Sequence, residues 1–108
     1  MAIIRIRIEI TKSCIKRGVC SNPSSCAAAL AIGKVIKRGE MIKRPNISLG
    51  TSEITISVDD DYCWMNTPVK LQYFINKFDD GKRHVKPMSF YLDIPKRFLK
   101  ASAIKVGK

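Results

Sequence analysis

Several segments of the chain alternate between apolar and polar residues, which is the pattern of a β-strand with one buried face. Residues 2–10 place isoleucines at positions 4, 6, 8 and 10 and charged side chains between them. Residues 53–58 alternate in the same way, and residues 85–94 repeat the pattern with bulkier apolar side chains. Residues 62–65 follow three consecutive aspartates, so we expect them to return beside residues 53–58 as the second arm of a hairpin.

The most apolar segment, residues 24–36, has apolar side chains at helical spacing and is predicted to form the central helix. Ser24 or Ser25 is expected to cap its first turn, because a hydroxyl can accept a hydrogen bond from a free backbone N–H. Residues 37–39, Lys-Arg-Gly, are expected to close it, since cations and glycine both favour helix C-termini. Three consecutive alanines and a glycine keep this helix narrow, so we expect a β-sheet to pack closely against it.

Two further helices are predicted from their end signals. A short one is expected to begin after Thr11, which can cap it, and to end at Gly18. A longer one, residues 69–78, follows Thr67 as the expected cap and Pro68 as the expected first helical residue. Its apolar stripe consists of Leu71, Phe74, Ile75 and Phe78.

The major elements follow in the order β–α–β–β–α–β, which predicts a single α+β domain over residues 1–95. An antiparallel sheet would carry two helices on one face, an arrangement that resembles the split βαβ plan. Residues 41–48 supply the weakest strand, because Pro45 confines them to a sheet edge or an irregular segment. Residues 96–108 are expected to form a basic C-terminal tail whose last residues fray.

Charge is unevenly distributed along the chain, which holds 20 Lys and Arg against nine Asp and Glu, a formal net charge of +11. Residues 1–50 hold ten cations and two carboxylates, and residues 81–108 hold eight cations and one carboxylate. Residues 51–80 are acidic, with two cations and six carboxylates. A folded surface can therefore present one basic face, which favours phosphate backbones, anionic surfaces or acidic proteins as partners. The same balance excludes mimicry of DNA, although an ordinary solvated basic surface also accounts for it.

The candidate residues for binding nucleic acid or another partner come from two basic clusters. They are Lys34, Lys37, Arg38, Lys43, Arg44, Lys82, Arg83 and Lys86. A third cluster, formed by Lys96, Arg97 and Lys100, lies in the predicted tail. A solvated face explains each cluster singly, whereas the three together favour a surface that binds polyanions.

Few aromatic residues are available to stack on nucleic acid bases. Tyr62, Trp64 and Tyr91 are the candidates for exposure, because the core is expected to take most of Tyr73, Phe74, Phe78 and Phe90. Contact with the nucleic acid backbone is therefore favoured over stacking on single strands.

The cysteines, aspartates and single histidine could hold a metal ion, but their spacing favours other roles. The four cysteines are Cys14, Cys20, Cys26 and Cys63. They contain no Cys-x-x-Cys pair, so buried free thiols are the favoured interpretation over a zinc site of four thiolates, one of which His84 could replace. Residues 59–61, three aspartates, could bind a divalent cation but are typical of a hairpin turn. Because no glycine-rich elbow or phosphate loop occurs either, we expect no metal, no cofactor and no enzymatic activity.

No run of about 18 uncharged apolar residues occurs, so no membrane span is expected. Charged residues interrupt the apolar N-terminal segment, which a signal peptide would not allow. We therefore expect an intracellular, cytoplasmic protein without disulfides.

Two stretches carry a resemblance to a known family. The first joins Ile-Lys-Arg-Gly at residues 15–18 and Cys20 to Ser-Cys-Ala-Ala-Ala-Leu at residues 25–30. The second joins residues 74–81, which end in Phe-Asp-Asp-Gly, to residues 85–92 with Pro-Met-Ser-Phe. Both look similar to a family of small, mostly uncharacterised bacteriophage and prophage proteins. The resemblance implies a phage or mobile-element origin and a life inside a host cell, and it implies no activity.

The charge and the resemblance together favour a small, non-enzymatic phage-type binding protein. We expect its basic face to engage nucleic acid or a host nucleoprotein complex, and inhibition of a host defence system is one role of that kind. The alternative is an interaction protein that recognises an acidic protein partner or assembles with itself, without binding nucleic acid. The oligomeric state stays open at this point.

Overall fold

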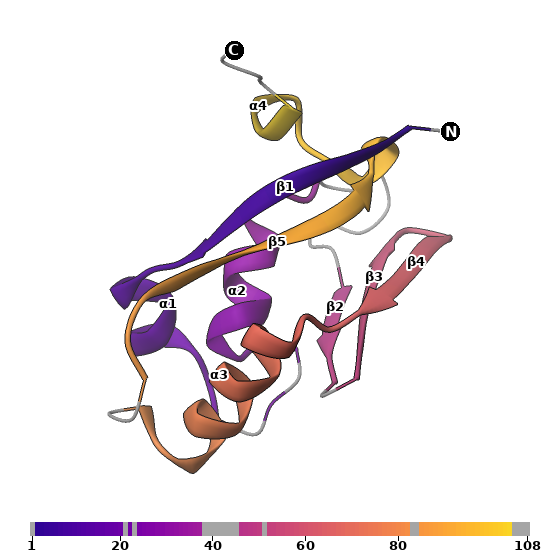
Figure 1. Cartoon of the computed structure of the whole chain (residues 1–108). Helices are drawn as coiled ribbons and strands as arrows, with labels where there is room; N and C mark the ends of the chain where they lie inside the picture. The colour runs from indigo at the N-terminus through magenta and orange to yellow at the C-terminus, as the bar shows by residue number, and fades with distance from the viewer. Residues whose placement is uncertain are drawn as a thin grey trace.

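Two antiparallel sheets and the helices packed against them build the domain (Figure 1). The computed structural model describes residues 2–20, 22, 24–37, 46–50, 52–82 and 85–104. Along the chain the elements are β1 (Ile3–Ile10), α1 (Lys12–Arg17), α2 (Ala27–Gly33), β2 (Asn46–Leu49), β3 (Glu53–Val58), β4 (Asp61–Asn66), α3 (Val69–Asp80), β5 (Met88–Pro95), the 3-10 helix η2 (Lys96–Phe98) and α4 (Ala101–Ile104). The predicted single α+β domain is confirmed.

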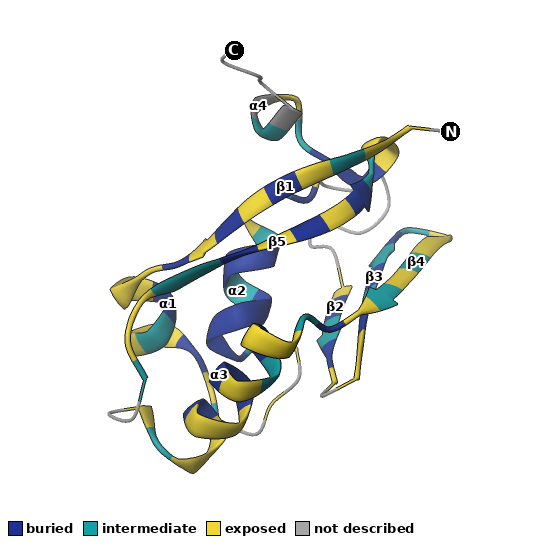
Figure 2. Cartoon of the chain, viewed as in Figure 1, coloured by how far each residue is buried: buried dark blue, intermediate teal, exposed yellow. Residues whose placement is uncertain are grey.

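The first and last strands, β1 and β5, form a long antiparallel pair. Ile8 lies opposite Phe90, and Ile6 opposite Leu92, along an eight-residue register. The alternation read from the sequence is confirmed, because these inward side chains are buried while the side chains between them are exposed (Figure 2). Each strand therefore gives one face to the core and one to solvent.

The three middle strands form a second sheet in the order β2–β3–β4. Ile54 and Ile56 of the central strand β3 are completely buried. Asp59 and Asp60 form the turn to β4, and Asp59 adopts a positive φ of 54°, a conformation that aspartate tolerates better than most residues. The predicted hairpin is thus confirmed, but among the described residues no strand pairing joins this sheet to β1–β5, so there are two sheets in place of one.

Helix α2 contacts both β1 and β2, and five of its seven residues are buried. The predicted serine caps are wrong: the helix begins at Ala27 with Cys26 in the capping position and no side-chain hydrogen bond there. The backbone N–H groups of Ser24 and Ser25 instead donate to Oδ1 of Asn22 at 3.0 and 3.1 Å, which holds both serines in the turn before the helix. The predicted closure at residues 37–39 is also wrong, because the helix ends at Gly33.

The short helix α1 follows its prediction closely. Thr11 caps it by accepting a hydrogen bond from the backbone N–H of Cys14, and Gly18 terminates it. Gly18 has an ordinary φ of −68°, so its conformation does not require glycine. The close packing around residue 18 requires glycine, because a Cβ there would lie 2.6 Å from the backbone nitrogen of Ala27 and 2.9 Å from the Phe78 ring. The absence of a side chain lets α1, α2 and α3 meet at this point.

Helix α3 buries the predicted apolar stripe, within which the rings of Phe74 and Phe78 stack with centroids 6.0 Å apart. The predicted cap is wrong, since Pro68 and not Thr67 occupies the capping position. Thr67 is buried, and its hydroxyl donates to the carbonyl oxygen of Gly50 at 3.0 Å. The threonine therefore ties the end of β4 to the loop before β3.

The packed core extends past residue 95 into the predicted tail. Phe98 of η2 and the following Leu99 are buried, and Leu99 forms an isolated antiparallel bridge with Ile36. Residues 105–108, at the end of that tail, lie outside the described residues, as do residues 41–45 of the predicted weak strand.

Candidate binding surfaces

The bridge between Ile36 and Leu99 brings together two basic segments that are far apart in the sequence. The backbone N–H of Lys37 donates to the carbonyl oxygen of Phe98 at 2.8 Å, and that of Lys100 donates to the carbonyl oxygen of Val35 at 2.9 Å. We call the four cations around this bridge the basic corner. They are Lys37, Lys96, Arg97 and Lys100.

The turn of the β3–β4 hairpin reaches the basic corner through one ion pair. Nε of Arg97 lies 2.6 Å from a carboxylate oxygen of Asp61, the first residue of β4, and the Arg97 guanidinium also lies over the Phe98 ring at 4.7 Å. The hydrogen bond from Arg97 holds the pKa of the Asp61 carboxyl below its usual value, and the charge of Lys37 acts in the same direction. Within the described part of the chain, the corner is therefore a defined piece of the fold with one carboxylate, that of Asp61, set among its cations.

The remaining predicted binding residues that the structure describes, Lys34, Lys82 and Lys86, do not join this corner. Lys82 donates from Nζ to the carbonyl oxygen of Lys16 at 2.8 Å, which satisfies a free carbonyl at the end of α1. Lys82 and the exposed Lys86 precede β5, whereas η2 follows it, so about 25 Å of strand separates the two basic groups. Lys34 lies near the thiol of Cys14. The predicted site residues Arg38, Lys43, Arg44 and Arg83 lie outside the described residues.

The outer face of the β1–β5 pair holds charges that the sequence analysis did not single out. Arg5 pairs with Asp93 directly across the two strands through two hydrogen bonds of 3.0 and 3.3 Å. Arg7 pairs with Glu9 on its own strand at 3.4 Å. Alternation alone placed these side chains outward and brought Arg7 next to Glu9, but the Arg5–Asp93 pair depends on the register between two strands that are distant in sequence. This face is largely neutralised by its own ion pairs.

The outer face of β4 presents two aromatic side chains to solvent. Tyr62 is 65% exposed and Trp64 is 59% exposed, and both point to the same side of the strand because they are two residues apart. Tyr91, the third aromatic residue predicted to be exposed, is also exposed but lies on the other sheet, opposite Arg7. The predicted exposure of these three aromatic side chains is confirmed, but the expected burial of Tyr73 is wrong, because Tyr73 points away from the apolar stripe of α3 and is 67% exposed.

The four cysteines are free thiols with different surroundings. Cys14 is buried, which raises the pKa of its thiol, but hydrogen bonds with Thr11 and Lys34 lower the pKa by more. Burial raises the pKa of the Cys26 and Cys63 thiols. Cys20 donates from its thiol to the carbonyl oxygen of Phe78 at 3.0 Å. Among the described residues, no three Cys, His, Asp or Glu side chains converge into a group that could hold a metal ion.

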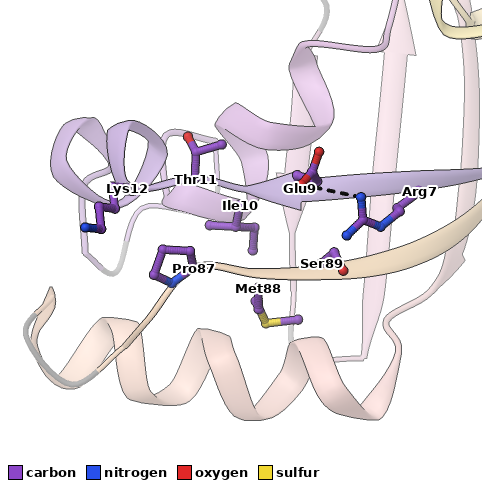
Figure 3. Close-up of a pocket in the computed structure, with 8 residues that line it drawn as sticks. All are labelled: Arg7, Glu9, Ile10, Thr11, Lys12, Pro87, Met88 and Ser89. Atoms are coloured by element: carbon purple, nitrogen blue, oxygen red, sulfur yellow. Dashed lines mark ion pairs between the residues drawn. The ribbon is translucent and has the colours of Figure 1, made fainter.

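A shallow hollow lies where β1 passes into α1 beside the start of β5 (Figure 3). The Arg7–Glu9 ion pair lies along one side of it, and Met88 points from β5 toward α3. Arg7 and Glu9 thus neutralise each other, Lys12 adds a further cation to the lining, and the hollow shows no nucleophile paired with a base. No helix within the described residues combines the length and the apolar composition that a membrane crossing requires.

Comparison with known proteins found no matching family model, no matching curated protein and no matching solved structure. The resemblance to bacteriophage proteins therefore stays a prediction.

Proposed function

We propose that this chain is a non-enzymatic nucleic-acid-binding protein that contacts the phosphate backbone through the basic corner. The observation that carries the proposal is the Ile36–Leu99 bridge, which holds Lys37 next to Phe98 on one side of the bridge and Lys100 next to Val35 on the other, although the two lysines are far apart in the sequence. Cations held by a fold lose less conformational entropy on binding than cations on a disordered segment. A net charge of +11 adds long-range attraction to any polyanion.

The arrangement of Lys100 strengthens this proposal. Its backbone N–H is hydrogen-bonded to Val35, so it belongs to the folded domain and does not lie on a frayed tail. Lys37 is exposed and is followed in the sequence by Arg38, which adds a further cation to the same segment. Arg97 is engaged by Asp61 and acts chiefly to position η2 against the hairpin. Lys37, Lys96 and Lys100 are thus the proposed phosphate contacts.

The test is a polarisation titration of labelled single-stranded and duplex oligonucleotides at two salt concentrations. The variant combines Lys37→Ala, Lys96→Ala and Lys100→Ala, and its matched control combines Lys12→Ala, Lys70→Ala and Lys77→Ala, which removes the same charge from α1 and α3. We expect the wild-type affinity to fall steeply with salt, because bound phosphates release their counterions. The corner variant should bind more weakly and lose about one unit of salt slope per contact, while the control keeps most of both.

Two results would contradict the proposal. Equal losses in the corner variant and its control would mean that net charge alone attracts the nucleic acid. An absence of binding to any oligonucleotide at low salt would favour the alternative of an acidic protein partner. The phage setting, the host cytoplasm and the inhibition of a defence system remain predictions from the resemblance.

A further inference from the structure

The outer face of the β2–β3–β4 sheet combines aromatic rings with small polar side chains. The register of the three strands arranges these side chains in two rows across the sheet. One row is Ser48, Thr55 and Trp64, and the other is Asn46, Ser57 and Tyr62. We call these six residues the aromatic face.

The two rings lie open above their neighbours. Trp64 has only Thr55 opposite it on β3, and Tyr62 has only Ser57, so no large cross-strand side chain covers either ring. Residues two apart on a strand are separated by about 7 Å. That spacing is about twice the ~3.4 Å rise per nucleotide along one strand of a duplex. Two bases can therefore occupy the two rings only if they no longer stack on each other, as in an extended single strand.

The aromatic face is uncharged, and its charged neighbours lie at its ends. Its four polar residues carry hydroxyl or amide groups, which can donate and accept hydrogen bonds at base edges. Glu53 lies at one end of β3, and Asp60 lies in the turn at the other end. Alternation along β4 turns Asp61 to the opposite side from Tyr62, and Asp61 is where Arg97 of the basic corner meets the hairpin. A strand that passes the β4 edge can thus keep its phosphates at the corner and its bases on the face.

We propose that the aromatic face stacks the bases of single-stranded nucleic acid while the basic corner holds the phosphates. This inference rests on the proposed function and specifies the form of nucleic acid that the site takes. The polyanionic charge of a single strand complements the net charge of the chain, and base–aromatic stacking tolerates any sequence because every base has a π-face. Stacking is therefore predicted to supply affinity that phosphate contacts alone do not.

The experiment compares a thymidine oligonucleotide with an abasic strand of the same length and the same number of phosphates. Trp64 is the single tryptophan, so its fluorescence reports directly on the aromatic face. We expect the thymidine strand to quench Trp64 and to bind more tightly than the abasic strand at equal salt. A uridine strand of the same length distinguishes RNA from DNA as the source of the bases.

Variants separate stacking from charge. Trp64→Ala and Tyr62→Ala should each weaken thymidine binding by about five- to a hundredfold. They should leave abasic binding and the salt slope unchanged, and Tyr62→Phe should retain the stacking. The matched control is Tyr73→Ala, because Tyr73 is equally exposed but lies on α3. All of these side chains are mostly exposed, so a melting curve should show each variant folded.

Each outcome decides a different claim. Salt-dependent binding that is equally tight for the thymidine and abasic strands, and that Trp64→Ala does not weaken, would overturn this inference and leave the proposed function in place. No binding to either strand at low salt would overturn both. A third result would also overturn the inference. Trp64 emission would change with protein concentration alone, and sedimentation would show a dimer that Trp64→Ala abolishes. A second copy of the chain would then cover the aromatic face.

Discussion

The two sheets of this protein have similar inner faces and different outer faces. Both bury isoleucines in a common core, to which the β1–β5 pair adds Phe90. Outside, the β1–β5 pair neutralises itself through Arg5–Asp93 and Arg7–Glu9 ion pairs. The outer face of the three-stranded sheet is uncharged apart from Glu53 at the end of β3, and it leaves the rings of Tyr62 and Trp64 open. The same alternation therefore produces one face that is satisfied by its own side chains and one that has unused contact area.

This difference bears on where a partner binds. An ion pair that already exists must be broken or rearranged before either charge can contact a phosphate, which reduces the gain from that contact. An exposed ring loses only water when a base stacks on it. The three-stranded sheet and the adjoining basic corner are thus better suited to a partner than the β1–β5 pair, although that pair carries two arginines on its outer face.

The largest expected effects come from the inner faces, which should respond alike. Ile8→Ala in β1 and Ile56→Ala in β3 each remove a fully buried side chain, so each should lower the free energy of unfolding by about 2–5 kcal/mol. Because both side chains belong to one core cluster, urea unfolding should stay a single transition in both variants. Ile3→Ala is the control, since Ile3 is mostly exposed. A separate early transition in Ile56→Ala would mean that the sheets are independent units.

A smaller and more local effect is expected at the end of β4. Thr67→Val keeps the shape of the side chain but removes the hydrogen bond to the Gly50 carbonyl, which should cost about 1–3 kcal/mol. Amide hydrogen exchange should rise more in β3 and β4 than in β1 and β5, because the bond ties the hairpin to its own loop. Thr55→Val on the outer face is the matched control. Equal loss of protection in both sheets would contradict a role confined to the three-stranded sheet.

The smallest expected effect concerns the ion pairs of the outer surface. Arg5 and Arg97 hold the pKa of Asp93 and Asp61 below the usual value, so each pair stabilises the fold at neutral pH. That contribution is lost as the pH falls through the lowered pKa, below the ordinary aspartate value of about 3.9. Asp93→Asn and Asp61→Asn should therefore be slightly less stable than wild type at pH 7 and equal to it at low pH. Urea midpoints across this range measure the difference, which added salt should also reduce.

Opposite results at the two pairs would sharpen the comparison of the sheets. Asp93→Asn should leave nucleic acid binding unchanged, because Asp93 lies on the β1–β5 face. Asp61→Asn removes the carboxylate from the basic corner and should strengthen binding while loosening the hairpin. If Asp93→Asn strengthens binding and Asp61→Asn does not, the freed Arg5 is the contact and the site lies on the other sheet.

Local patterns along the chain were enough to predict most elements and the direction of most side chains. Strand alternation in residues 2–10 and 53–58, the stripe of α3 and the Thr11 cap all depend on residues within a turn or two of one another. The exposure of Tyr62 and Trp64 follows from the same period of two. These features can be predicted without the tertiary packing, because the periodicity of the backbone alone determines which side chains share a face.

The tertiary structure determined which segments that are distant in the sequence contact one another. It ended α2 at Gly33, and Ile36 beyond the helix pairs with Leu99, although the sequence continues with helix-compatible residues. It divided the strands into two sheets, and the register of β1 against β5 placed Arg5 opposite Asp93. It also gathered the basic corner from residues 37 and 96–100. Hydrogen bonds and ion pairs between segments far apart in the sequence depend on topology, and no local periodicity carries that information.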